Sequence, residues 1–288
     1  MAARTWGGQG AMALGRRGGM TGRATRSPRL AIPGTTNLRD VGGLPAAGGK
    51  QVARGRLYRG EVLASSGAAE MNGAYQRGQA TAYEGLGLMT VFDLRSTVER
   101  ERTPSAWGLA TGAKVVEEPI PDGAPGGVPD YVALLRAGDL RAFTVNDLGR
   151  FYCGLLDKYA EVFSRIVRRL AKQSSVPALV HCSAGKDRTG LVVALVLDVL
   201  GTPREAILED YILTGVNRPD RIHAYADELA RVGVDPMAVR TLFESPWGAM
   251  EMALDHLDER YQGPTGYLLR SGSVGPEDLE ALRAQLVE

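Results

Sequence analysis

Cysteine is scarce in this chain, with only Cys153 and Cys182 among 288 residues. Two cysteines are too few for a disulfide framework, so the fold must depend on a hydrophobic core, and a reducing compartment is favoured. Hydrophobic residues make up 44% of the sequence, which is ample for one sizeable core. A formal net charge of +1 gives no global electrostatic argument for nucleic acid, and we expect no such partner.

A long apolar run is also missing. The best candidate, residues 191–200, is far shorter than the ~18 apolar residues of a membrane span. Residues 1–29 have no acidic residue and many glycines, and they lack the apolar region of a secretory signal. We therefore expect no integral membrane association and a cytoplasmic location, with secretion without a signal peptide left open. Residues 1–29 are predicted to be a disordered tail or a mis-annotated start, with a transit peptide as the alternative.

One ten-residue motif, H-C-S-A-G-K-D-R-T-G at residues 181–190, stands between a predicted strand (176–180) and a predicted buried helix (191–200). Cys182, five residues and then Arg188 is the spacing of the phosphate loop of cysteine-dependent phosphatases. A tight loop that enters a helix turns its backbone N–H groups inward. Together with the positive helix N-terminus, these groups form a bowl that binds a phosphate dianion.

The residue types of the motif suit a phosphoryl transfer through a covalent intermediate. The loop donors and Arg188 favour the thiolate form of Cys182, which is the nucleophile, and a guanidinium grips two phosphate oxygens as lysine cannot. No metal and no cofactor is needed. The predicted phosphate-binding set is the loop itself, with two further residues in supporting roles. The set comprises Ser183, Ala184, Gly185, Lys186, Asp187 and Arg188, and the supporting residues are His181 and Thr189.

Other protein classes fit the motif less well. A nucleotide-binding loop would need a glycine that is missing here and a Ser or Thr at the position of Asp187. A rhodanese-like sulfur-transfer loop has no evident use for residues 186–189. The strongest alternative is a catalytically weak module that binds phosphoproteins or phosphoinositides, which an intact Cys182 and Arg188 disfavour.

Three further motifs extend the pattern, namely N-L-R-D-x-G-G at 37–43, L-Y-R-G at 57–60 and F-D-L-R at 92–95. With the phosphate loop, and in this order, they make the chain resemble the tyrosine phosphatases of bacteria and fungi that include dual protein and lipid phosphatases. The resemblance covers roughly residue 32 to the C-terminus. It implies hydrolysis of phosphotyrosine in proteins through a phosphocysteine, with phosphoserine, phosphothreonine and phosphoinositides as further substrates.

The general acid that protonates the leaving group has three candidates. Asp187 ranks slightly first because relatives share its place in the loop, although it could merely orient Arg188. Asp122 ranks second, on a Pro- and Gly-rich loop, with a plain turn residue as the alternative. Asp93 ranks third, at the end of a predicted strand, and it could instead pair with Arg95 or Arg39.

Lys186 bears on substrate breadth. Its resemblance to the lysine of loops that act on phosphoinositides predicts a contact with a second phosphate on the substrate. The alternative is an ion pair with an acid, such as Asp93 or Glu99, that holds the loop.

Predicted strands alternate with helices before the motif, at 88–94 and 114–118 among others, and only helices are expected after it. This order indicates one α/β domain over residues 30–288, a three-layer sandwich with a largely parallel central sheet. Cys182 should lie beyond the carboxyl end of a central strand. Cap-then-proline starts are predicted for three later helices, at Thr202, Asp235 and Ser245. Resemblance to lid-bearing relatives predicts a movable helical lid over residues 220–247.

Overall fold

The computed structural model describes residues 29–65, 73–123, 129–218 and 221–288. The predictions for residues 1–28 lie outside these ranges. The central sheet has five strands in the order β1 (Arg39–Asp40), β2 (Leu57–Gly60), β7 (Ala178–His181), β5 (Thr90–Asp93) and β6 (Lys114–Glu117). Only β1 is antiparallel to its neighbour, so the prediction of a largely parallel sheet is confirmed.

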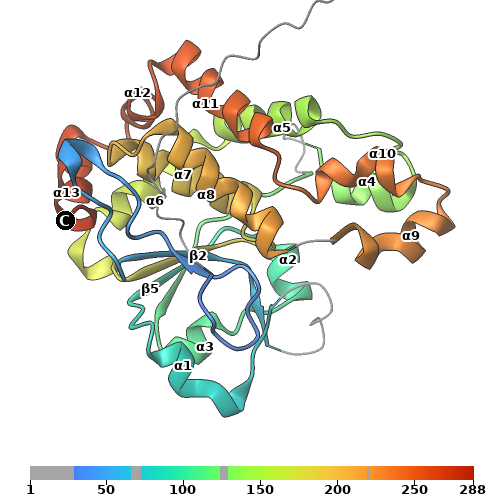
Figure 1. Cartoon of the computed structure of the whole chain (residues 1–288), viewed down its shortest axis with the longest axis horizontal. Helices are drawn as coiled ribbons and strands as arrows, with labels where there is room; N and C mark the ends of the chain where they lie inside the picture. The colour runs from blue at the N-terminus through green and yellow to red at the C-terminus, as the bar shows by residue number, and fades with distance from the viewer. Residues whose placement is uncertain (1–28, 66–72, 124–128, 219–220) are drawn as a thin grey trace, which may run out of the picture.

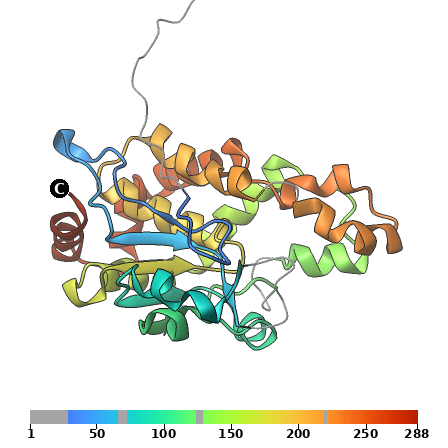
Figure 2. The same cartoon turned by 60° about the horizontal axis from the view of Figure 1, so that its bottom comes forward.

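Side chains of the central strands alternate between two hydrophobic cores, one on each face of the sheet. Leu57, Phe92 and Val180 enter the larger core, whereas their neighbours Tyr58, Val91 and Leu179 enter the smaller one. This period of two is what a sheet covered on both faces requires. The predicted three-layer sandwich is therefore confirmed, and Figures 1 and 2 show the sheet between the two helical layers.

The smaller layer contains α1 (Ala80–Glu84) and α3 (Trp107–Thr111), whose Tyr83 and Trp107 fill its core. Helix α2 (Thr97–Arg102) lies at the carboxyl edge of the sheet. A short parallel pair joins β3 (Leu63–Ala64) and β4 (Gly73–Ala74). Short 3-10 turns complete the region at η1 (Ala47–Gly49) and η2 (Arg77–Gln79).

The larger layer is built around α7 (Asp187–Val199), which is buried on nearly every face. The surrounding helices are α5 (Val145–Lys158), α6 (Ala160–Leu170), α8 (Arg204–Asn217), α11 (Trp247–Tyr261), α12 (Pro264–Arg270) and α13 (Pro276–Leu286), with η3 (Gln173–Ser175) before β7. In the described part of the chain, every named element after β7 is helical, as predicted. None of the described helices is long and apolar enough to cross a bilayer.

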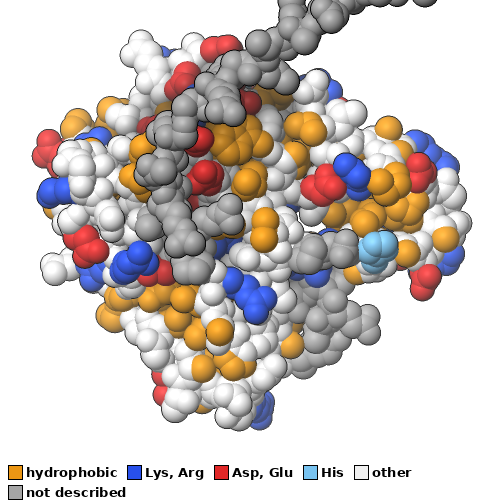
Figure 3. Space-filling view, viewed as in Figure 1, with side chains coloured by type: hydrophobic (Ala, Val, Ile, Leu, Met, Phe, Trp, Pro, Cys, Tyr) orange, Lys and Arg blue, Asp and Glu red, His pale blue; other side chains and the backbone are white. Residues whose placement is uncertain are grey.

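A projecting lobe extends from one end of the molecule (Figure 1). It contains α4 (Tyr131–Ala137), η4 (Arg221–Tyr225), α9 (Ala226–Arg231), α10 (Pro236–Val239) and η5 (Arg240–Leu242). Figure 3 shows a recess between this lobe and the body of the molecule. The lobe therefore stands beside the carboxyl edge of the sheet, where the motif residues lie.

Candidate active site

The phosphate loop leaves the central strand β7 and enters α7. Cys182 directly follows β7 and is only 1% exposed, so the strand end places the thiol at the floor of the loop. Gly185 has a φ of +68°, and a Cβ there would collide with the carbonyl of Gly60. Both the backbone conformation and the close approach thus require glycine at this position.

The carbonyl groups of the loop are held from behind by two of the sequence motifs. Asn37 Nδ2 donates to the Ala184 carbonyl at 3.1 Å and to the Gly185 carbonyl at 3.3 Å. Arg59 Nη2 donates to the same Gly185 carbonyl at 2.9 Å. Because carbonyl oxygens that point backward leave the opposite side of the loop to N–H groups, these bonds support the bowl. The N-L-R-D and L-Y-R-G motifs therefore serve the loop although neither reaches the cavity.

A buried carboxylate neutralises the arginines of that support. Asp210, from α8, bonds to Arg39 Nε at 2.9 Å and also to Arg59 Nη1, and all three side chains are at most 1% exposed. Burial would raise the pKa of Asp210, but the two guanidinium groups hold it below its usual value. Sequence reasoning missed Asp210, because an Asp within a helix carries no local sign of a partner so distant along the chain.

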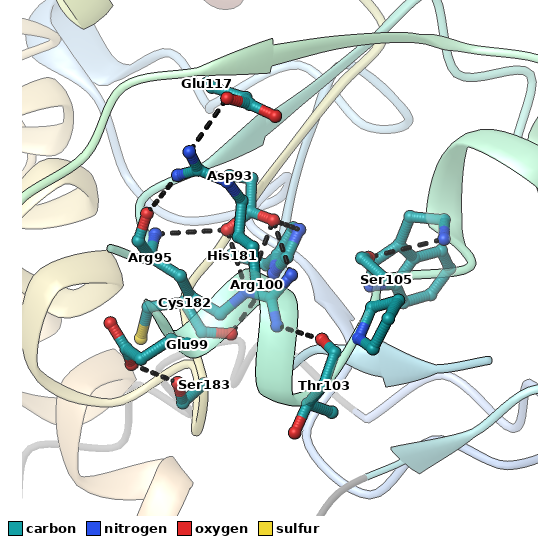
Figure 4. A network of polar contacts seen from close by, with 12 residues as sticks. Asp93, Arg95, Glu99, Arg100, Thr103, Ser105, Glu117, His181, Cys182 and Ser183 are labelled. Carbon is teal, nitrogen blue, oxygen red and sulfur yellow. Dashed lines mark hydrogen bonds and ion pairs between the residues drawn. The ribbon is translucent and has the colours of Figure 1, made fainter. Parts of the chain in front are cut away.

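Glu99 holds the side chain of Arg188 in place, and Figure 4 shows the contact of the same carboxylate with Ser183. Its two carboxylate oxygens accept from Arg188 Nη1 and Nη2, both at 2.7 Å, and Ser183 Oγ donates to it at 2.6 Å. Burial would raise the pKa of Glu99, but the charge and hydrogen bonds of Arg188 hold it well below its usual range. Glu99 thus fixes the plane of the guanidinium, a role that the sequence analysis did not assign. The signal was there in the capping box of Ser96 and Glu99, which fixes the start of α2.

Asp93 lies next to the loop but faces away from the thiol. Its oxygens accept from Arg95 Nε at 2.9 Å and Arg95 Nη2 at 2.6 Å, which matches the predicted alternative of an Arg95 pair (Figure 4). Burial would raise the pKa of Asp93, but His181 and Arg95 hold it below its usual value. His181 is fully buried, its Nδ1 lies 3.1 Å from the Cys182 carbonyl, and burial lowers its pKa.

The other two aspartates line the cavity above Cys182. Burial raises the pKa of Asp122 to about 6, against the pull of Arg188 and aided by Glu99 and Asp187. Its Oδ1 is buried and has no hydrogen-bond partner among the described residues. Asp187 instead accepts a 2.6 Å bond from the Tyr152 hydroxyl. Burial and the charge of Asp187 raise the pKa of Tyr152 well above its usual value, so this phenol remains a donor.

Lys186 contacts neither of the acids named as its alternative partners. Its Nζ donates to the carbonyls of Leu242 at 2.6 Å and Glu244 at 2.9 Å, and the side chain is buried. The alternative of a pair with an acid such as Asp93 or Glu99 is wrong for these two carboxylates, which are engaged by Arg95 and Arg188, but Asp187 Oδ1 lies 3.4 Å from Lys186 Nζ. Lys186 joins the phosphate loop to the end of the projecting lobe.

Thr189 adds no polar contact that the structure describes. Its side chain is fully buried in α7, and Oγ1 has no hydrogen-bond partner among the described residues. Its supporting role, as far as the described residues show it, is packing.

The cavity over the loop has a volume of about 800 Å³. Its floor carries Cys182 and Arg188, and its walls come from α2, from the loop before α4, from α5 and from the projecting lobe. Apolar side chains line part of the cavity, among them Tyr131 of α4, Phe151 of α5 and Phe243, which follows η5. A thiol, a fixed guanidinium and two carboxyl groups thus face one cavity that is partly apolar.

The model of the tyrosine phosphatase family matches residues 30–288, which include every residue of this site. The chain therefore belongs to the tyrosine phosphatase family, which confirms the prediction of a protein-tyrosine phosphatase.

Two relatives cover most of the chain. It is 32% identical to the triple specificity protein phosphatase PtpB of Mycobacterium tuberculosis, over 89% of this chain and 98% of that protein. A candidate tyrosine-protein phosphatase of Cupriavidus necator is 29% identical over 83% of this chain and 82% of its own length. The crystal structure of P. aeruginosa TpbA aligns with 81% of this chain and 99% of its own, at 16% identity and a TM-score of 0.34.

Proposed function

We propose that the protein hydrolyses phosphotyrosine in proteins by two displacements at Cys182, with phosphoserine, phosphothreonine and phosphoinositides as further substrates. The observation that carries the proposal is the fixed pair of Cys182 and Arg188 in one cavity, with Glu99 holding the guanidinium in place. The name of the mycobacterial relative, a triple specificity phosphatase, supports breadth beyond phosphotyrosine.

In the first displacement, Cys182 Sγ attacks phosphorus in line with the departing oxygen, and an aspartic acid protonates that oxygen. Arg188 and the loop N–H groups stabilise the equatorial oxygens of the transferring group. In the second, water attacks the phosphocysteine and returns the thiolate. Every side chain that acts in these steps belongs to this chain, and we propose that the enzyme acts in the cytoplasm.

We assign the proton to Asp122 first and to Asp187 second, which reverses the order expected from the sequence. A general acid must hold its proton near the working pH, and a pKa of about 6 gives Asp122 a protonated fraction that an ordinary aspartate lacks. Asp187, in contrast, is already engaged by the protein, because it accepts the Tyr152 hydroxyl and lies 3.4 Å from Lys186 Nζ. Asp93 is occupied by Arg95 and is not part of the proposal.

Leaving-group dependence tests this assignment. Asp122→Asn should lower kcat/KM far more for an alkyl phosphate than for an aryl phosphate with a good leaving group, by about 10²-fold or more. The wild-type kcat/KM should fall as pH rises through about 6, because the acid form is lost, and this limb should vanish in the variant. Asp187→Asn is the matched comparison. If only that variant shows the two effects, Asp187 is the acid.

A turnover panel without added metal tests the function itself. Peptides with phosphotyrosine, phosphoserine or phosphothreonine and soluble phosphoinositides would be compared at equal concentration. We expect phosphotyrosine peptides to be hydrolysed fastest. Tight binding of the same compounds with no release of phosphate would instead identify a phosphate-binding module.

We also propose that residues 220–247 act as a lid, with Lys186 as its latch. The apolar cavity wall includes Tyr225, Leu242 and Phe243 from this segment, and Tyr225 and Phe243 contact each other with ring centroids 4.5 Å apart. Lys186 holds the Leu242 and Glu244 carbonyls. A cationic ammonium on two carbonyls ties the segment to the very loop that binds phosphate.

Hydrogen exchange checks the latch. Lys186→Met removes two charge-assisted hydrogen bonds, so residues 236–246 should exchange at least about tenfold faster while α7 stays protected. Lys50→Met, at an exposed position that does not line the cavity, is the control. Unchanged exchange over 236–246 in the Lys186 variant would mean that the lobe is packed permanently without the latch.

A further inference from the structure

Two buried tyrosines lead from the larger helical layer to the edge of the active-site cavity. Tyr152 of α5 and Tyr211 of α8 are at most 1% exposed, and their hydroxyl oxygens lie 2.8 Å apart. The Tyr152 hydroxyl donates to Asp187 Oδ1 at 2.6 Å, and Asp187 lines the cavity that contains Cys182. Neither tyrosine lines that cavity itself, and the mechanism above gives no role to this pair, which we call the hydroxyl chain.

The protons of the hydroxyl chain can be placed. Burial and the charge of Asp187 raise the pKa of both phenols well above the usual value, so each hydroxyl keeps its one proton. Tyr152 uses its proton in the bond to Asp187. The bond between the two phenols is therefore donated by Tyr211, because a hydroxyl with one proton donates only once. The hydroxyl chain thus runs in one direction, from Tyr211 through Tyr152 to Asp187.

The hydroxyl chain ends differently from another buried phenol. Tyr267 is 1% exposed, and its hydroxyl donates to the backbone carbonyl of Leu156 at 2.6 Å, which satisfies the buried hydroxyl and involves no other side chain. Tyr152 instead donates to a side chain that is 25% exposed and faces the reacting thiol across one cavity. The contact with Asp187 therefore joins the packed interior to the site of the chemistry.

The last glycine of the phosphate-loop motif makes room for the hydroxyl chain. A Cβ at Gly190 would lie 3.2 Å from the Tyr211 ring and 3.3 Å from the methyl group of Met250, so a larger residue would press on both. Gly190 follows Asp187 by three residues and shares its face of α7. The same face of the helix thus carries the carboxylate and the space that the Tyr211 ring needs.

The two carboxylate oxygens of Asp187 have different surroundings. Oδ1 accepts the Tyr152 hydroxyl and lies 3.4 Å from Lys186 Nζ. Among the residues that the structure describes, no hydrogen bond or ion pair engages Oδ2. One oxygen is thus fixed by the interior of the protein, whereas the other remains an acceptor for a group in the cavity.

We propose that Tyr211 and Tyr152 are positioning residues that hold Asp187 for the second displacement, in which Asp187 Oδ2 takes a proton from the attacking water. The water oxygen forms a bond to phosphorus, the P–S bond breaks with its electron pair on Cys182, and the water proton passes to Asp187. Asp122 remains the acid of the first displacement, so each step has its own carboxyl group. This inference rests on the phosphatase function proposed above and assigns two further residues to it.

Burst kinetics with a dinitrophenyl phosphate tests the hydroxyl chain, because a good leaving group makes the second displacement the slower one. In Tyr152→Phe, the burst of phenolate, which reports the attack by Cys182, should keep the wild-type rate. The steady turnover that follows, which reports hydrolysis by water, should fall about tenfold, since the hydrogen bond that fixes the carboxylate is lost. The phosphocysteine should then accumulate, as measured by mass spectrometry of acid-quenched samples.

Two comparisons separate positioning from packing. Tyr211→Phe should slow the steady turnover less than Tyr152→Phe does. The double variant should match Tyr152→Phe alone, because Tyr211 acts only through Tyr152. Tyr267→Phe removes the hydroxyl of a buried tyrosine that does not line the cavity, and it should leave both phases at their wild-type rates.

The outcomes separate the hydroxyl chain from the function. If the wild type hydrolyses no phosphate monoester, the proposed function fails. If the wild type is active and both phases of Tyr152→Phe are unchanged or slow by the same factor, the positioning role is wrong and the phosphatase stands. A slower burst with unchanged steady turnover would make Asp187 the acid of the first displacement and overturn the inference. Additive losses in the double variant would reduce the two phenols to packing and also overturn it.

Discussion

Cys182→Ser should abolish turnover while phosphate esters continue to bind. The bowl, Arg188 and Glu99 remain in this variant, but a serine hydroxyl at neutral pH is a poor nucleophile without an adjacent base. We expect kcat for an aryl phosphate to fall by at least about 10³-fold, the scale on which enzymes lose rate when their nucleophile is removed. Calorimetric titration with a phosphotyrosine peptide should show a Kd near the KM of the wild type.

Cys153→Ser is the matched control. Cys153 is half-buried on α5, where its Sγ lies 3.9 Å from the Met252 carbonyl of α11, and it does not line the cavity. Its replacement should leave turnover unchanged. Full activity of Cys182→Ser, or a loss of equal size in both serine variants, would rule out a phosphocysteine at residue 182.

Asp210→Asn should destabilise the fold and disorder the loop together. The change leaves Arg39 and Arg59 fully buried without their counter-charge. Removing one partner of a buried ion pair lowers the free energy of unfolding by roughly 3–5 kcal/mol. For a chain of this size that corresponds to a fall in Tm of roughly 10 °C. Activity should drop further than the folded fraction, because Arg59 also holds the Gly185 carbonyl.

Two comparisons make this prediction specific. Asp255→Asn removes a carboxylate from an exposed pair with Arg204, and it should change Tm by little. The depressed pKa of Asp210 gives stability that is present above its ordinary titration range and is lost as pH falls through its lower folded value. Asp210→Asn should therefore flatten the acid side of the stability profile. Equal Tm values for the two variants would show that the buried cluster does not support the loop.

The features that could be predicted from the sequence are those that depend on residues close together in the chain. The loop residues 182–188 are close in sequence, so their spacing alone defines a bowl. The strand patterns at 90–93 and 178–181 could be predicted for the same reason, because burial on both faces produces short apolar runs. The cap of α10 is a further local success, since Asp235 accepts from the Met237 N–H and Pro236 begins the helix.

The predictions that failed concern contacts between residues that are far apart in the sequence. Thr202 and Ser245 were predicted to cap α8 and α11, but the N-cap positions are Pro203 and Pro246. Ser245 Oγ instead accepts from the Gly215 N–H, in a contact that no local pattern could indicate. Glu99 and Asp210 were missed as positioning groups for the same physical reason. Their partners come from other elements, and only the packed sheet and helices bring them together.

The long-range contacts that support the phosphate loop from behind have a consequence for when Cys182 becomes reactive. Asn37 contacts the loop across 147 positions of the chain, and Asp210 lies 171 positions from Arg39. Contacts of such long range form late and together with the rest of the native structure. A nascent chain that ends within the larger helical layer, before α8, contains Cys182 but not the charge balance that shapes its bowl. The Cys182 thiol should thus become a good nucleophile only when synthesis has passed Asp210. This delay would protect an incomplete chain from modification at its own active-site sulfur.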